Sequence, residues 1–342
     1  MAVPNSGKLV VNSGKSLDRR LWRGIAILGF AVLAIASLSL SLMKGAVNIA
    51  PAEIIRALSA PASGVQAQII WNIRLPRILV GALVGMNLAL AGAILQAVMK
   101  NPLADPHIIG ISSGAGLAGI SVLVLLPRME YLLTPIAFIG AMGAACLIYI
   151  LAWKGGIRPM RMVLAGVAVS AFLGSGISAL LVFYSDRVHG ALLWMVGGLT
   201  ARSWPHFWII LPYSVGGGML ALLGAKKLNV LNLGDEAARG LGLNVELTRL
   251  LMTAVAALLA ASAVSVVGLL GFVGLIVPHV ARLLIGSDHR FLLPGAALLG
   301  MTVVMLGDTL ARTLFAPVEL PAGIIMAFLG APFFLYLLRR EA

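Results

Sequence analysis

Long apolar segments constrain this sequence more than any other feature. The run over 250–285 is almost uninterrupted. As one helix it would extend roughly 54 Å, well beyond the ~30 Å hydrocarbon core of a bilayer. It must therefore break, and Gly268, Gly271 and Gly274 are the points of weakest helix propensity. We expect two spans here, the second of them short and carrying Pro278.

Ten apolar segments make up most of the chain. Hydrophobic residues are 60% of the 342 and charged residues 11%, whereas soluble domains carry roughly a quarter charged residues. A water-soluble fold could not bury so much apolar surface, so the solvent must be lipid. This predicts an all-α integral membrane protein with about ten transmembrane helices. We expect them at about 21–43, 77–99, 108–127, 134–153, 162–184, 205–224, 249–269, 271–286, 291–311 and 320–338.

The basic residues lie between these segments and predict the topology. With ten alternating spans and a cytoplasmic N-terminus, 17 of the 25 Lys and Arg residues fall inside and 8 outside. The positive-inside rule then places both termini in the cytoplasm. The same distribution explains the net charge of +13 without nucleic acid. We expect a disordered basic tail over 1–20 and a single transmembrane domain over 21–340. The apolar run 24–43 exceeds the ~7–15-residue core of a signal peptide, so it is a retained span.

Signatures of cofactor and metal chemistry are missing from the sequence. Cys146 is the single cysteine, and no Cys/His cluster has zinc spacing. Residues 14–16 (GKS) resemble the end of a phosphate-binding loop, but Leu9 stands where that motif needs a glycine. We therefore expect no catalytic residues, no metal site and no cofactor.

Residues 110–114 match G-x-S-x-G, the motif around a nucleophilic serine. Ser112 would need a histidine that accepts its proton. His107 lies at the same membrane face, and His279 and His289 lie in or beside a later inner loop, so nothing positions one at membrane depth. The pattern favours a flexible helix start and leaves an intramembrane serine protease as a remote alternative.

The predicted spans contain almost no ionisable side chains. Asn87, Gln96 and Asp308 are their notable polar residues, with Asp308 near an outer end. Ion-coupled carriers usually place acidic, histidine or lysine residues at the bilayer midplane. Energy for transport is therefore expected from outside the chain, with an ion-coupled secondary transporter as a remote alternative. The residues lining a pathway are not identified by the sequence.

The inner loop over 226–247 contains a short predicted helix between Gly234 and Gly242. Asp235 suits its N-cap, an acidic residue follows, and a glycine can end it. Such a helix either connects two spans or presents a rigid surface to a cytoplasmic partner.

Arginines on the outer side run against the positive-inside bias. Arg74 and Arg77 open the second predicted span, while Asp308 and Arg312 share one face near the outer end of the ninth. Arginines there are usually interfacial, and Asp308 and Arg312 can form an i,i+4 pair. An acidic protein partner is the alternative, because a guanidinium suits carboxylates.

Eight ordered motifs resemble one known family over about residues 20–340. They are Arg74-Leu75-Pro76-Arg77, Gln96 with Asn101–Pro106, Gly110–Gly116, the 234–242 loop, Gly271–Arg282, Gly307-Asp308-x3-Arg312, Glu319–Gly323 and Gly330–Phe334. Together they are similar to the permease subunits of bacterial ATP-binding-cassette (ABC) importers for ferric siderophores, haem and vitamin B12, the FecCD type.

The resemblance implies a multi-pass protein of the bacterial cytoplasmic membrane that is not itself an enzyme. It implies pairing with a second permease, two cytoplasmic ATPase subunits and an extracytoplasmic binding protein. A ferric siderophore is the first cargo, with vitamin B12 or haem as alternatives. By the same resemblance, Arg74, Arg77 and Arg312 dock the binding protein. The segment coupled to the ATPase comprises Gly234, Asp235, Glu236, Ala237, Ala238, Arg239, Gly240, Leu241 and Gly242.

Overall fold

A computed structural model describes residues 13–45, 47–59, 64–107, 110–154 and 159–341. Over those residues the fold is helical and has no β-strand. Seven helical segments are long and apolar enough to cross a membrane. They contain α1 (Ser13–Met43), α4 (Leu75–Met99), α6 (Leu133–Ala152), α7 (Pro159–Phe183), α9 (Trp204–Leu231), α11 (Val245–Val267) and α13 (His289–Thr313).

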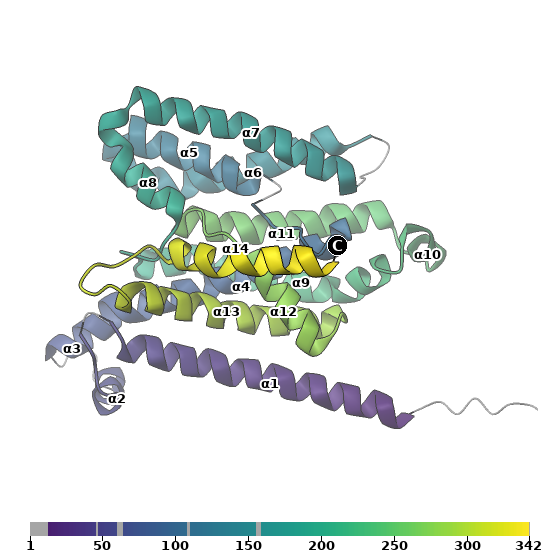
Figure 1. Ribbon diagram of the computed structural model, residues 1–342, viewed down its shortest axis with the longest axis horizontal. Helices are drawn as coiled ribbons and strands as arrows, with labels where there is room; N and C mark the ends of the chain where they lie inside the picture. The colour runs from purple at the N-terminus through teal and green to yellow at the C-terminus, as the bar shows by residue number, and fades with distance from the viewer. Residues whose placement is uncertain (1–12, 46, 60–63, 108–109, 155–158, 342) are drawn as a thin grey trace, which may run out of the picture.

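Three shorter apolar helices complete the set. They are α5 (Ile111–Leu125), α12 (Val273–Ile285) and α14 (Ala322–Glu341). Each of the ten predicted segments coincides with one of these ten helices. The predicted break is confirmed, because α11 ends at Val267, and Gly268 and Phe272 both adopt a positive φ before α12 begins. Figure 1 shows the long helices running roughly side by side.

The second span differs from its prediction because it begins earlier. Residues 64–99 form one continuous helical segment of α3 (Gly64–Gln68), the π-helix η1 (Ile69–Arg74) and α4, rather than starting at residue 77. Pro76 has no backbone N–H and would interrupt an α-helix. The wider turns of η1 accommodate this proline, so the segment continues through it.

Helix α4 is the buried centre of the fold, and glycines bring its neighbours into backbone contact. A Cβ at Gly85 would lie 2.1 Å from the Gly300 carbonyl oxygen of α13, and one at Gly92 would lie 1.9 Å from that of Gly274 in α12. No side chain fits at such separations, so only glycine permits this packing. The helices α4, α12 and α13 are thereby held together as one block.

A second group of helices, α5 to α8, lies on one side of the bundle (Figure 1). Gly114 and Gly140 make the same kind of contact between α5 and α6, since a Cβ at Gly114 would lie 2.3 Å from the Gly140 oxygen. The short helix α8 (Val188–Val196) lies outside the ten predicted spans. Figure 1 shows it running from the end of α7 toward the start of α14.

Two helical features at the N-terminal end differ from the prediction. Helix α1 begins at Ser13, so residues 13–20 are helical rather than part of a disordered tail, while residues 1–12 lie outside the described part. Helix α2 (Pro51–Ser59) was not predicted. It buries Ile54 and Ala57 on one face and leaves most of its other residues exposed, a pattern too short to register as a span.

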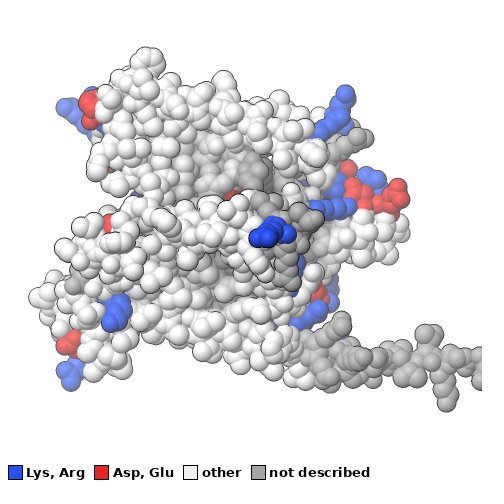
Figure 2. Space-filling view, in the orientation of Figure 1, with Lys and Arg blue, Asp and Glu red and all other residues white. Residues whose placement is uncertain are grey.

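The charged side chains are distributed as a membrane requires. Figure 2 shows Lys, Arg, Asp and Glu gathered mainly at the two ends of the bundle, with a broad uncharged band between them. A band of this kind matches the hydrocarbon core of a bilayer. At one end projects α10 (Asp235–Gly240), the short helix predicted between residues 234 and 242.

Candidate functional site

Helix α10 is a compact projection fixed by glycines at both ends. Gly234 precedes it with φ +107° and Gly242 follows it with φ +80°, backbone conformations that other residues rarely adopt. Ala238 is fully buried, and its carbonyl accepts a hydrogen bond from the Leu243 amide at 3.0 Å. The predicted coupling loop 226–247 is shorter than expected, because α9 continues to Leu231 and α11 starts at Val245.

Asp235 joins α10 to two long helices. Its Oδ1 accepts from Lys100 Nζ at 2.7 Å and from Arg249 Nη2 at 2.8 Å. Burial opposes ionisation here, but these two hydrogen bonds lower the pKa of Asp235 below its usual value. The predicted N-cap role is wrong. Gly234 occupies that position, and the Asp235 carboxylate turns to the basic side chains instead.

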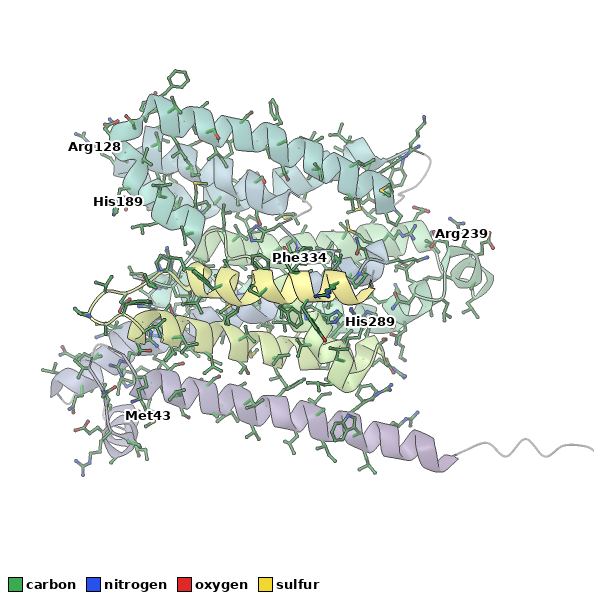
Figure 3. The ribbon with its side chains drawn as sticks, viewed as in Figure 1. Met43, Arg128, His189, Arg239, His289 and Phe334 are labelled. Atoms are coloured by element: carbon green, nitrogen blue, oxygen red, sulfur yellow. The ribbon has the colours of Figure 1, made fainter. Side chains whose placement is uncertain are left out.

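The outward surface of the projection carries exposed leucines beside charged side chains. Leu233 is 63% exposed and Leu241 66% exposed, on either side of α10. Arg239, labelled in Figure 3, also points outward and lies 3.4 Å from Glu246. Exposed leucines on the polar end of a membrane protein are typical of a surface that binds another protein.

A second inner cluster was missed by the sequence analysis. Asn229 at the end of α9 donates to Asp288 Oδ1 at 2.7 Å and accepts from the His289 amide at 2.8 Å. Arg290 hydrogen-bonds Asp288, which lowers the pKa of that carboxyl. The cluster joins α9 to α13. The one local signal was Asp288 directly before an apolar run, the position of an N-cap, which it occupies.

The outer arginines form a buried ion network. Arg77 donates to both oxygens of Asp308, at 2.9 and 3.0 Å, and to Glu319 at 2.8 Å. Arg312 Nε lies 3.2 Å from Asp308, which confirms the predicted i,i+4 pair. Arg74 donates to backbone carbonyls at the end of α1 and just beyond it.

The three outer arginines are buried and paired within the chain. Arg74, Arg77 and Arg312 are only 4–6% exposed, and each has an acceptor within the chain. Glu319 is the more accessible member, with a side chain 35% exposed. A buried guanidinium must be paired, and the long-range partner Asp308 satisfies Arg77. Sequence spacing gave no sign of that pairing.

Ser112 does not belong to a catalytic pair. It is buried at the start of α5, and its Oγ has no hydrogen-bond partner among the described residues, histidines included. The glycines of the motif have packing roles instead. Gly110 carries φ +77° at the helix start, and Gly114 lies against α6.

Three chain segments meet backbone to backbone at Gly197, Gly268 and Gly323, which we name the glycine junction. The Gly323 amide donates to the Gly197 oxygen at 3.0 Å, and a Cβ at Gly268 would lie 2.1 Å from the Trp194 oxygen. The junction thus joins the end of α8, the break between α11 and α12, and the start of α14. Larger residues at these three positions would push the segments apart.

Two cavities adjoin the glycine junction on different sides. The larger measures about 650 Å³ and the smaller about 370 Å³. Val196, Leu269 and Gly323 line the larger, and Gly198, Val267 and Pro321 line the smaller. Each of the three segments therefore passes from one cavity to the other within two residues.

Comparison with known proteins identifies the family to which this fold belongs. The profile of the FecCD transport family matches residues 33–340. The chain is 40% identical to the Fe(3+)-citrate import system permease protein YfmE of Bacillus subtilis, over 93% of this chain and 96% of that protein. It is 40% identical to the hemin transport system permease protein HmuU of Yersinia pestis, over 80% of this chain and 84% of that protein. It is 45% identical to the cobalamin import system permease protein BtuC of Halobacterium salinarum, over 79% of this chain and 73% of that protein.

Two solved structures also match the fold of this chain. An inward-facing metal-chelate type ABC transporter matches with a TM-score of 0.82 and 29% identity, over 93% of this chain and 99% of that chain. PsaBC from Streptococcus pneumoniae matches with a TM-score of 0.57 at 19% identity, over 83% and 94%, which shows the fold alone. Because the family profile spans nine tenths of the sequence, the chain belongs to the FecCD transport family and is a permease subunit of an ABC importer for iron-chelate type substrates, not an enzyme.

Proposed function

We propose that this permease carries a ferric siderophore inward across the bacterial cytoplasmic membrane, driven by ATP hydrolysis on two separate ATPase subunits. Relatives named for iron citrate and iron hydroxamate support an iron cargo. Import of haem or vitamin B12 by the same architecture is the second candidate, because relatives named for those substrates are 40% and 45% identical.

The proposed assembly contains a second permease subunit, the two ATPases, an extracytoplasmic binding protein and the surrounding lipid. Each protomer crosses the membrane ten times, with both termini in the cytoplasm. The seven long and three shorter apolar helices support that number. Figure 1 supports the orientation, since the start of α1, the end of α14 and α10 lie at the same end of the bundle.

The pair of exposed leucines that flank α10 is the observation that carries the coupling proposal. Leu233 and Leu241 fit a groove on an ATPase, and Asp235 links the helix to α4 and α11 through its two basic partners. Closure of the ATPase dimer presses on α10 and shifts the permease between inward- and outward-facing states. Such a shift needs about 5 kcal/mol to reverse a strongly biased equilibrium, which nucleotide-dependent contacts can supply.

Uptake of radiolabelled ferric siderophore into proteoliposomes tests the coupling role. Changing Arg239→Glu and Gly240→Pro together should abolish ATP-dependent uptake while the protein still inserts, because the helix and its charge are both lost. Lys227→Glu, also exposed near the inner end of α9, is the matched control and should transport normally. Normal uptake by the double variant rules the coupling role out. Uptake by the permease alone, driven by an ion gradient, identifies a secondary transporter instead.

Docking of the binding protein is proposed at the outer arginine network. Arg77 is covered by Glu319, so an acidic side chain of the binding protein reaches it by taking the place of that carboxylate. Reversing Arg74 and Arg77 to glutamate should weaken capture of the loaded binding protein in a pull-down.

Glu319→Gln provides the sharper test of docking, because it removes the competing carboxylate and leaves the buried arginines in place. Capture should tighten in this variant. Unchanged capture in both variants leaves the arginines as structural residues only.

A further inference from the structure

The larger cavity beside the glycine junction, which we name the junction cavity, combines an apolar wall with one polar corner. Phe272, Ile324 and Phe328 are among its apolar lining residues, while Asp105 and His107 supply ionisable groups. Its volume of about 650 Å³ lies within the roughly 300–1,000 Å³ of small-molecule sites. The cavity is therefore large enough for a bulky organic solute.

His107 has an unused hydrogen-bonding atom at this corner. Its Nε2 is buried and has no partner among the described residues. A Cβ built at Gly271 would lie 3.5 Å from that atom, an ordinary van der Waals contact, so a methyl-sized group fits against the imidazole at this position. A buried nitrogen without a partner is costly, so a partner from outside the chain is expected at such a position.

Asp105 positions the histidine. Its Oδ1 accepts the backbone N–H of His107 at 2.8 Å, which fixes the turn that carries the ring. Asp105 itself is buried against Gly274 at the start of α12, where a Cβ would lie 2.9 Å from its Oδ2. The polar corner is thus built onto α12 rather than carried on a free loop.

We propose that the junction cavity is this protomer's binding site for the chelate in transit, with the His107 Nε2–H donating to an oxygen of the ligand. The ligand class is a bulky organic chelate whose outward-facing oxygen atoms accept hydrogen bonds and whose carbon skeleton contacts the apolar wall. The proposal rests on the proposed function. It adds a place and a contact atom to a pathway that the sequence left unidentified.

Two substitutions separate cavity volume from hydrogen bonding. His107→Phe keeps a ring and removes the donor. Gly271→Leu fills the space before the ring, and its Cβ fits because the nearest atom is at 3.5 Å. The matched controls are His189→Phe, at an exposed position on α8 labelled in Figure 3, and Gly143→Leu, whose Cβ meets no atom within 4 Å.

The assay is ATP-dependent uptake by the assembled importer in proteoliposomes, with ferric citrate, a ferric trihydroxamate, haemin and cobalamin as probes. His107→Phe and Gly271→Leu should each lower uptake of the transported probe about tenfold, with ATP hydrolysis retained and the controls unchanged. Wild-type uptake in both variants overturns the cavity proposal. Failure of the unaltered importer to take up any probe with ATP overturns the proposed function instead.

A labelling experiment tests the cavity proposal if those variants do not assemble into an importer. Ala327 lines the junction cavity, and Cys146 is the sole cysteine of the chain. In a Cys146→Ala, Ala327→Cys importer, a maleimide should react at 327, and the transported probe should slow that reaction severalfold. If the thiol at 327 does not react even without the probe, the cavity is filled by another protein segment. If the maleimide reacts at the same rate with and without the probe, no chelate binds there. Either result overturns the proposal.

Discussion

Replacing Asp308 with asparagine should destabilise this permease strongly. The outer network holds three arginines, Arg74, Arg77 and Arg312, against two carboxylates, Asp308 and Glu319, an excess of one positive charge (3 − 2 = 1). Asp308→Asn raises that excess to two and removes the negative charge that pairs with both Arg77 and Arg312. Breaking a buried pair by removing one partner typically costs about 3–5 kcal/mol.

An exposed ion pair in the same chain supplies the control. Asp186 lies 3.5 Å from Arg187 with its side chain 74% exposed, so Asp186→Asn should cost no more than about 1 kcal/mol. Denaturation of purified protein in mixed detergent micelles measures both variants under one condition. The double variant Asp308→Asn, Arg312→Leu restores the original charge excess and should recover part of the lost free energy.

Equal stability of Asp308→Asn and Asp186→Asn would refute this reasoning. That result would mean that the outer arginines are hydrated or paired elsewhere, and that burial does not make Asp308 essential. A double variant less stable than Asp308→Asn alone would show instead that packing of the arginine stem, and not its charge, dominates.

Three further perturbations have expected outcomes. Gly85→Leu should cost about 3 kcal/mol or more in the same denaturation assay, because its Cβ would meet the Gly300 oxygen at 2.1 Å, whereas Gly143→Leu should be neutral. Asn87→Ala should cost about 0.6–1.7 kcal/mol, because Asn87 donates to two buried serine hydroxyls between helices. Burial opposes ionisation of Asp235, but its basic partners lower its pKa in the folded protein. The stabilisation from these partners is therefore fully present above the unfolded-state pKa of about 3.9, and it is lost as the pH falls through the lower folded-state pKa. Protection of the α10 amides against hydrogen exchange, relative to the intrinsic rate at each pH, should therefore fall only below about pH 4.

The sequence predicted what depends on local pattern. The apolar segments, the break within 250–285 and the short helix between Gly234 and Gly242 all follow from hydropathy and glycine placement, and the structure confirms each. The pair Asp308 and Arg312 was predicted because it is four residues apart on one helix.

Contacts between distant residues were beyond prediction. Arg77 and Asp308 are 231 positions apart, and Lys100 and Asp235 are 135 apart, so a single sequence gives no sign that they meet. For the same reason the burial of the outer arginines was not predicted, and Asp235 was expected to be an N-cap. The start of the second span was missed because Pro76 usually begins a helix, whereas here η1 lets the helix continue through it.

The continuous helix over 64–99 has a mechanical consequence. Thirty-six residues at 1.5 Å each give a rod of roughly 54 Å. Arg74 and Arg77 lie 10 and 13 residues after its first residue, and Lys100, directly after its last, is bonded to Asp235 of α10. A stiff element with charged contacts toward both faces can tilt or slide but cannot absorb displacement along its length. Events at the two membrane surfaces are therefore geometrically tied within a single protomer.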